Sequence, residues 1–140
     1  MGRHRVRSTC VRYLLDTHVM LWWLRDDPKL GSRTRMAIAN SRSRLMVSVA
    51  SFWELSIKRR NGKFDEEGSA LFDQVIDEGI EVLGVQPHHL RALELLEKRP
   101  DHNDPFDHLI LAQAIAEDAV LITGDKQIRS YGIRCFPDVR

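Results

Sequence analysis

Cysteine is scarce in this sequence, because Cys10 and Cys135 are the only two among 140 residues. Neither belongs to a Cys-x-x-Cys pair, which leaves a zinc ribbon or a dithiol redox motif without support. Two isolated thiols are typical of proteins in a reducing cytosol. We therefore expect a cytoplasmic location.

Long apolar runs and an excess of one charge are also missing. The apolar stretch at 13–24 carries Asp16 and His18 near its middle and is too short and polar to span a bilayer, and no secretory apolar segment is present. Lysine and arginine number 21 against 20 acidic residues, so attraction to nucleic acid must come from local patches. Because 43% of the residues are hydrophobic, we expect a folded protein. Because no apolar stretch is long enough to span a bilayer, we expect no membrane contact.

One segment has a biased composition. Arg3, Arg5, Arg7 and Arg12 make the first dozen residues basic and poor in apolar side chains. This predicts a flexible basic arm over residues 1–12, which either touches phosphates or is simply an unstructured start. A single globular domain is expected over residues 13–140.

Short apolar strands alternate with helices along this domain. Strands are predicted at 13–16, 45–50, 80–85 and 119–123, with a candidate fifth at 133–137. Helices are predicted at 19–26, 34–44, 51–63, 69–79, 88–99 and 104–118. The alternation predicts an α/β fold, a three-layer α/β/α sandwich with a mainly parallel central sheet. Ligands of such folds bind beyond the carboxyl ends of the strands.

Four carboxylates stand at that edge of the predicted sheet. Asp16 directly follows the first strand, Asp125 comes shortly after the fourth, and Glu54 and Asp107 lie near the starts of two helices. Each has a simpler explanation when taken alone. Asp16 can be a helix cap, Asp125 a turn residue, and Glu54 the i, i+4 partner of Lys58 on an exposed helix.

The segment "HNDPFDH" at 102–108 contains two aspartates for which we expect different roles. Asp104 followed by Pro105 predicts a helix start, with the aspartate as N-cap. Asp107 shares a helix face with Ile110 and Leu111, so we expect it to point inward. Clustered buried carboxylates need a cation, and oxygen ligands select Mg²⁺ or Mn²⁺. Such a site favours metal-dependent phosphodiester hydrolysis.

Two further patterns are interpreted as structural. His88 and His89 are adjacent, and no Cys or Glu stands at ligand spacing, so we expect a solvated helix face. The remaining cluster is aromatic, and core packing is favoured over base stacking for Trp22, Trp23, Phe52 and Trp53.

Four motifs together resemble a known family. "LLDTHVMLWWL", "VSVASFWELSIKRRNGK", "HNDPFDHLILAQA" and "LITGDK" are similar to the PIN domain, specifically to VapC-type toxins of bacterial toxin-antitoxin pairs, over about residues 13–137. The resemblance implies a Mg²⁺-dependent endoribonuclease, with Mn²⁺ as a substitute, that is neutralised by a cognate antitoxin. It implies a homodimer or a toxin-antitoxin hetero-oligomer. Its catalytic acids map onto Asp16, Glu54, Asp107 and Asp125, and its metal ligands onto Asp16 and Asp107.

Other positions have subsidiary roles under this resemblance. Thr17, Thr123 and Asp104 are candidates to support the acids from close by. RNA contact is expected from the basic segment that follows Glu54, with Lys58, Arg59, Arg60 and Lys63, and from the arginines between positions 32 and 44, although basic runs are as often solvated helix faces. The sequence departs from the pattern of this family at two positions. It has His108 where many relatives have Arg, and Gly124 where a larger residue is common.

Alternatives from other classes remain open. A PIN-domain nuclease could act in RNA processing outside a toxin-antitoxin pair, and a non-catalytic module could use the acidic cleft to bind a basic partner. Haloacid-dehalogenase-like phosphatases need a second Asp where this chain has His18. Receiver domains need an Asp after the third strand, where this chain has Gln86.

Overall fold

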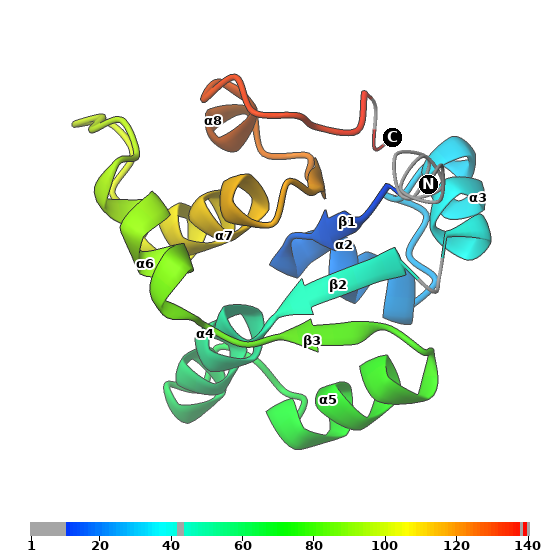
Figure 1. The fold of residues 1–140 in the computed structure, drawn as a ribbon. Helices are drawn as coiled ribbons and strands as arrows, with labels where there is room; N and C mark the ends of the chain where they lie inside the picture. Colours follow the sequence, from blue (N-terminus) through cyan, green and yellow to red (C-terminus); the bar gives the residue numbers. More distant parts are fainter. Residues whose placement is uncertain (1–10, 42–43, 138, 140) are drawn as a thin grey trace.

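The computed structural model describes residues 11–41, 44–137 and 139, and these form a parallel sheet between layers of helices (Figure 1). Residues 1–10, which make up most of the predicted basic arm, lie outside the described residues, as does Arg42 of the arginine cluster. Arg12 is described and binds within the domain, where its guanidinium Nη1 donates to Glu117 Oε1 at 3.0 Å.

Four short strands make the sheet, and each pairs in parallel with its neighbours. They are β1 (Tyr13–Leu15), β2 (Leu45–Ser48), β3 (Glu81–Leu83) and β4 (Val120–Ile122), in the order β3-β2-β1-β4. Leu14 of β1 is in register with Met46 on one side and Leu121 on the other. Because both faces of the sheet are covered, these strands are continuous apolar runs rather than alternating ones.

Seven helices connect and cover the strands within the described residues. They are α2 (Thr17–Leu24), α3 (Ser32–Asn40), α4 (Val49–Arg60), α5 (Gly68–Asp77), α6 (Pro87–Glu94), α7 (Pro105–Ala116) and α8 (Lys126–Arg129). Within the part of the chain that the structure describes, no helix has the length and apolarity needed to cross a bilayer.

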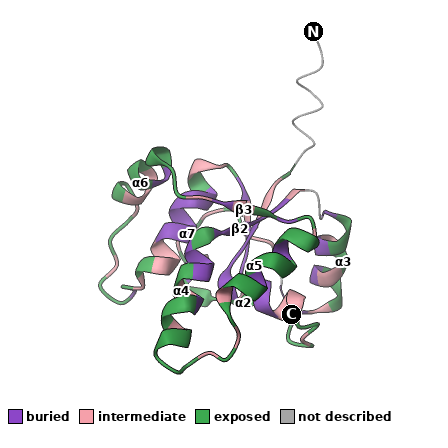
Figure 2. Cartoon of the chain, turned by 90° about the horizontal axis from the view of Figure 1, so that it is seen from below, coloured by how far each residue is buried: buried purple, intermediate pink, exposed green. Residues whose placement is uncertain are grey.

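Each face of the sheet has its own apolar core. Leu15 and Val47 point to the face covered by α2, α3, α4 and α5, whereas Leu14 and Met46 point to the face covered by α7 and α8. Helix α6 packs on α7 at the outside of this second layer (Figure 1). Most residues of β1, β2 and β4 are buried, as is the middle of α7 from Leu109 to Ala114 (Figure 2). The predicted three-layer α/β sandwich with a parallel sheet is therefore confirmed.

Several element boundaries differ from the predictions. Ser48 N-caps α4, its Oγ accepting from Ala50 N at 3.0 Å, so the helix begins at Val49 instead of 51 and the strand before it is shorter. The predicted helix at 88–99 ends at Glu94, and an irregular segment leads to α7. The candidate fifth strand is reduced to one bridge between Leu121 and Cys135. Helix α8 was not predicted, because four residues carry too little periodicity.

The predicted start of α7 is confirmed. Asp104 Oδ1 accepts from the backbone N–H groups of Phe106 at 2.9 Å and Asp107 at 3.2 Å, and Pro105 occupies the first helical position. These bonds satisfy two amides that have no partner inside the helix.

We expect Asp104→Ala to lower the free energy of unfolding by about 1 kcal/mol, because both amides lose their acceptor. Urea denaturation measures this effect. Asp104→Asn is the matched control, since its amide oxygen still accepts, and it should unfold within a few tenths of a kcal/mol of wild type. Equal losses for the two variants would show that the cap does not stabilise α7.

Candidate active site

Asp16 is buried at the end of β1, with both carboxylate oxygens bonded. Its Oδ1 accepts from Val19 N at 2.8 Å and caps α2, while its Oδ2 accepts from the hydroxyl of Thr123 at the end of β4. Only 5% of the residue is exposed. Burial raises the pKa of Asp16 to about 6, although the hydrogen bonds from Thr123 and Val19 oppose the rise. The helix cap therefore coexists with a carboxylate that is costly to ionise.

Asp107 stands in the first turn of α7, as predicted, and is half-buried. Its Oδ2 does not close a capping box but accepts from His102 Nε2 at 3.0 Å. Burial raises the pKa of Asp107. The bond from His102 lowers it, and repulsion from Asp104 and Asp125 raises it further. Two carboxylates at this edge of the sheet therefore resist ionisation.

Glu54 lies in the second turn of α4, not the first, because the helix starts earlier than predicted. Its Oε1 accepts from Thr17 Oγ1 at 3.0 Å, and its Oε2 lies 3.2 Å from Lys58 Nζ. The hydroxyl of Thr17 also lies 2.8 Å from that of Ser51, and both residues are buried. The predicted i, i+4 pair of Glu54 and Lys58 exists, but the Glu54 side chain is only 12% exposed. The pair is therefore partly buried on its Glu54 side and exposed on its Lys58 side.

Asp125 caps the short helix α8. Its Oδ1 accepts from Gln127 N at 2.8 Å and Ile128 N at 3.2 Å, and its own N–H donates to Thr123 Oγ1 at 3.0 Å. A Cβ at the preceding Gly124 would lie 3.1 Å from Val139 Cγ2, so a larger residue there would require the Val139 side chain to shift slightly.

The four predicted acids meet around one small cavity at the carboxyl edge of the sheet. This cavity, which we call the acidic cavity, has a volume of about 140 Å³. Five carboxylates and one lysine contribute to its lining, which consists of Asp16, Thr17, His18, Glu54, Lys58, Asp104, Asp107, Asp125 and Ile128. A neighbouring cavity of about 220 Å³ shares Asp16, His18 and Asp125. The acids thus come together from four distant segments.

The basic residues after Glu54 are not equivalent. Lys58 lines the acidic cavity and pairs with Glu54. The other three, Arg59, Arg60 and Lys63, are exposed at and beyond the end of α4. Trp53 is also exposed, at 59%, and packs edge-on against Phe106 with ring centroids 4.9 Å apart. The prediction that all four aromatic residues belong to the core is therefore wrong for Trp53.

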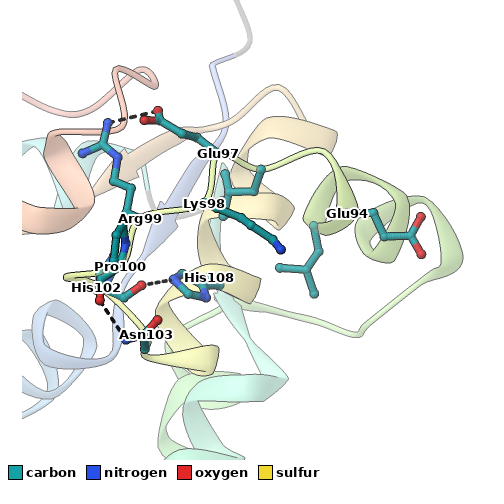
Figure 3. A pocket seen from close by; sticks show the side chains of 10 residues that line it. Glu94, Glu97, Lys98, Arg99, Pro100, His102, Asn103 and His108 are labelled. Atoms are coloured by element: carbon teal, nitrogen blue, oxygen red, sulfur yellow. Dashed lines mark hydrogen bonds and ion pairs between the residues drawn. The ribbon is translucent and has the colours of Figure 1, made fainter.

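A larger cavity of about 600 Å³ lies between α6, the segment that follows it and the start of α7 (Figure 3). Its lining includes two acids and two bases, and one pair, Arg99 and Glu97, is joined by a bond of 3.1 Å. Charge is balanced there, whereas carboxylates dominate the smaller cavity. The acidic cavity is therefore the better candidate for a cation site, although it is the smaller of the two.

The solvated-face interpretation of His88 and His89 is wrong for His89, which is fully buried. The Nε2 atoms of both rings lie within 2.9 Å of Glu117 Oε2. Hydrogen bonds lower the pKa of Glu117 to about 2, and the bond from His89 has the largest effect. The three candidate ligand atoms lie within 4.8 Å of one another. However, Gln86 N donates to His89 Nδ1 at 2.9 Å, so the neutral ring carries its proton on Nε2, the atom that a cation would need. This group is a hydrogen-bonded cluster.

Comparison with known proteins identifies the family. The model of the PIN domain family matches residues 13–133. The chain belongs to the PIN domain family. Ribonuclease VapC22 from Mycobacterium tuberculosis is 30% identical over 120 residues, which is 84% of this chain and 90% of that protein. The resemblance to the PIN domain and to VapC proteins that the motifs predicted is thereby confirmed.

Three solved VapBC structures share the fold of this chain. The VapBC2 structure from Rickettsia felis, bound to a promoter DNA fragment, has a TM-score of 0.68 at 18% identity and covers 90% of this chain and 98% of its own. DNA-bound VapBC from Salmonella typhimurium has a TM-score of 0.67 at 20% identity, with coverage of 90% and 97%. VapBC-1 from Haemophilus influenzae has a TM-score of 0.59 at 21% identity, and the match covers 90% of this chain and 97% of that chain.

Sequence reasoning missed His102 and Tyr131. His102 is buried and bonds Asp107, and its other ring nitrogen lies 3.0 Å from the Tyr131 hydroxyl. The sequence pointed to His102 only through its position two residues before Asp104, the N-cap of α7. Its partner Tyr131 follows α8, so no local pattern could connect the two.

Proposed function

We propose that this PIN-domain protein is a divalent-metal-dependent endoribonuclease toxin that hydrolyses RNA phosphodiester bonds and is neutralised by a cognate antitoxin. The observation that carries the proposal is the acidic cavity, in which five carboxylates face one lysine. A relative of this chain is named a ribonuclease, and VapBC proteins share its fold, which supports the same choice of function.

The donors of the acidic cavity fit a hard divalent cation. The carboxylate and hydroxyl oxygens that line it are ligands that Mg²⁺ and Mn²⁺ prefer, and no cysteine lines it. Asp16 and Asp107, both with a raised pKa, would hold the ion, since a cation compensates the cost of their ionisation. When bound, the ion supplies an activated water and neutralises charge on the phosphate.

The other residues of the acidic cavity would activate the water or hold the metal ligands in position. Glu54, held by Thr17 and Lys58, is placed to orient a water molecule or to accept its proton. Asp125, held by the amides of α8, contributes a further carboxylate to the cavity for the same purpose. Thr123 holds Asp16 in place, and Asp104 fixes the helix that carries Asp107. The site is therefore rigid before substrate arrives.

RNA binding is assigned to the basic end of α4. Lys58 lies at the cavity and can contact the phosphate that is cut, whereas Arg59, Arg60 and Lys63 are exposed where flanking phosphates would pass. The inhibitor is proposed to present an Arg or Lys to the acidic cavity, because charge-assisted bonds to clustered carboxylates are strong. Assembly with such an antitoxin, or as a homodimer, is the form we expect in the cytoplasm.

Purified protein, freed of antitoxin, is expected to cleave RNA in the presence of Mg²⁺ and to stop when EDTA is added, since the five carboxylates that line the cavity face a single lysine. Gel analysis of the fragments, followed by sequencing of their ends, measures cleavage and its position. Addition of Mg²⁺ in excess of EDTA is the control and should restore it. Cleavage that continues unchanged in EDTA would contradict metal dependence. Binding of a basic peptide without any RNA cleavage would favour a non-catalytic module.

A further inference from the structure

His102 joins the acidic cavity to the segment that follows α8. The residue is 4% exposed, its Nε2 lies 3.0 Å from Asp107 Oδ2, and its Nδ1 lies 3.0 Å from the Tyr131 hydroxyl. Both ring nitrogens therefore have a partner, and the partners come from different parts of the chain. An imidazole bound at both nitrogens has a fixed orientation.

The partners also fix where the proton of the ring lies. An ionised carboxylate only accepts hydrogen bonds, so Nε2 of His102 must donate to Asp107. In the neutral ring Nδ1 is then an acceptor, and it receives the hydroxyl proton of Tyr131. The order Tyr131 to His102 to Asp107 is thus a directed chain of two hydrogen bonds.

The backbone around His102 is held as firmly as its ring. His108 Nε2 donates to the His102 carbonyl at 2.8 Å (Figure 3). Gln127 Nε2 of α8 donates to the Asp101 carbonyl at 3.0 Å, and the guanidinium of Arg99 stacks on the Tyr131 ring at 4.3 Å. His108 therefore stabilises the backbone of the loop that carries His102.

We propose that His102, oriented by Tyr131, is a positioning residue of the cleavage site: it binds Oδ2 of Asp107 and so presents the other carboxylate oxygen to the acidic cavity. This inference rests on the proposed function and extends it to two residues that do not line that cavity. Partners of this kind that orient a carboxylate ligand typically change metal affinity or activity by about 10-fold to 100-fold when removed.

Two conservative variants separate the donor from the rest of the ring. In His102→Gln the side-chain amide nitrogen can reach the place of Nε2 and still donate to Asp107, whereas in His102→Asn the shorter side chain places its amide near Nδ1 and leaves Asp107 without a donor. Tyr131→Phe keeps the ring under Arg99 and removes only the hydroxyl. His88→Asn is the remote control, because His88 is exposed and lies in the Glu117 cluster.

The primary measurement is Mn²⁺ affinity, by titration calorimetry or by the Mn²⁺ spin-resonance signal, without RNA. We expect His102→Asn to bind Mn²⁺ about 10-fold to 100-fold more weakly. His102→Gln should stay within about 3-fold of wild type, and Tyr131→Phe should fall between the two. In RNA cleavage the same ranking is expected in kcat, with KM nearly constant, because the effect is on the metal carboxylate and not on RNA contact. His88→Asn should match wild type in both assays.

The outcomes distinguish this inference from the function on which it rests. Wild-type Mn²⁺ affinity and kcat in His102→Asn would overturn it, as would equal losses in His102→Gln and His102→Asn. If His102→Asn does not fold, His102→Gln and Tyr131→Phe decide the matter, and wild-type values for Tyr131→Phe overturn the role of the hydroxyl. Ranked Mn²⁺ affinities without RNA cleavage by wild type would support the positioning role and remove the ribonuclease function.

Discussion

Replacing Asp107 by Asn is expected to lower the rate of RNA cleavage by about 10³-fold, the upper range seen when one preorganised electrostatic group is removed from a reaction centre. The asparagine keeps the size of the side chain and an oxygen that can accept from His102, so the local packing is preserved. It removes the negative charge that a divalent cation requires. Asp16→Asn should have an effect of the same order, because its carboxylate lines the same cavity.

The control is Asp73→Asn, which removes one exposed carboxylate on α5, away from the acidic cavity. It should cleave at the wild-type rate, which shows that net charge alone does not matter. Cleavage of a defined RNA substrate is followed under single-turnover conditions, and induced growth arrest provides a second measurement. If both Asp16→Asn and Asp107→Asn retained cleavage, the acidic cavity would not be the reactive centre.

The metal-free protein is expected to lose stability as the pH rises from 4 to 7. Asp107, whose pKa burial also raises, contributes to this loss, and Asp16 contributes most. Its pKa is about 6 in the folded protein against 3.8 for the ordinary group. Below 3.8 both folded and unfolded states are protonated, and Asp16 contributes nothing to the difference. Between 3.8 and 6 the unfolded chain gives up the proton first, so stability falls with rising pH. Above 6 the loss is complete and amounts to about 3 kcal/mol.

Asp16→Asn isolates this effect, because the amide is never charged and its oxygen can still accept from Val19. In EDTA the variant should have nearly the wild-type free energy of unfolding at pH 4 and exceed it by about 3 kcal/mol at pH 7.5. Urea denaturation at several pH values gives the difference directly. Saturating Mg²⁺ should shrink it, since the ion stabilises only the folded wild type. A difference that does not vary with pH would show that burial of this carboxylate carries no cost.

The parts of the structure that the sequence predicted best depend on local chemistry. Asp104 followed by Pro105 defined the start of α7 because an N-cap involves only neighbouring residues. The order of strands and helices followed from apolar runs, since a covered parallel sheet leaves no polar face. The convergence of Asp16 and Asp125 then followed from the fold, because both follow strands of a parallel sheet and such strands end at one edge.

The parts that could not be predicted depend on contacts between distant segments. His89 is buried because Glu117 and Gln113, more than twenty residues away, supply its partners. Trp53 is exposed because Phe52 and Leu55 occupy the core face of α4, and its ring instead contacts Phe106 at the start of α7. Neither this contact nor the remote partners of His89 leaves a periodic signal in the sequence.

The hydroxyl of Thr123 on Asp16 has a consequence for the order in which the protein becomes active. Asp16 is among the first described residues, yet its second oxygen is bound only after β4 has joined β1 at the edge of the sheet. Asp125 and Tyr131 follow β4 in the chain as well. A nascent chain that has reached only the end of α7 therefore lacks a complete acidic cavity, however well its first three strands have paired. The acidic cavity is therefore among the last features to form during synthesis, and we expect an incomplete chain to lack RNA cleavage.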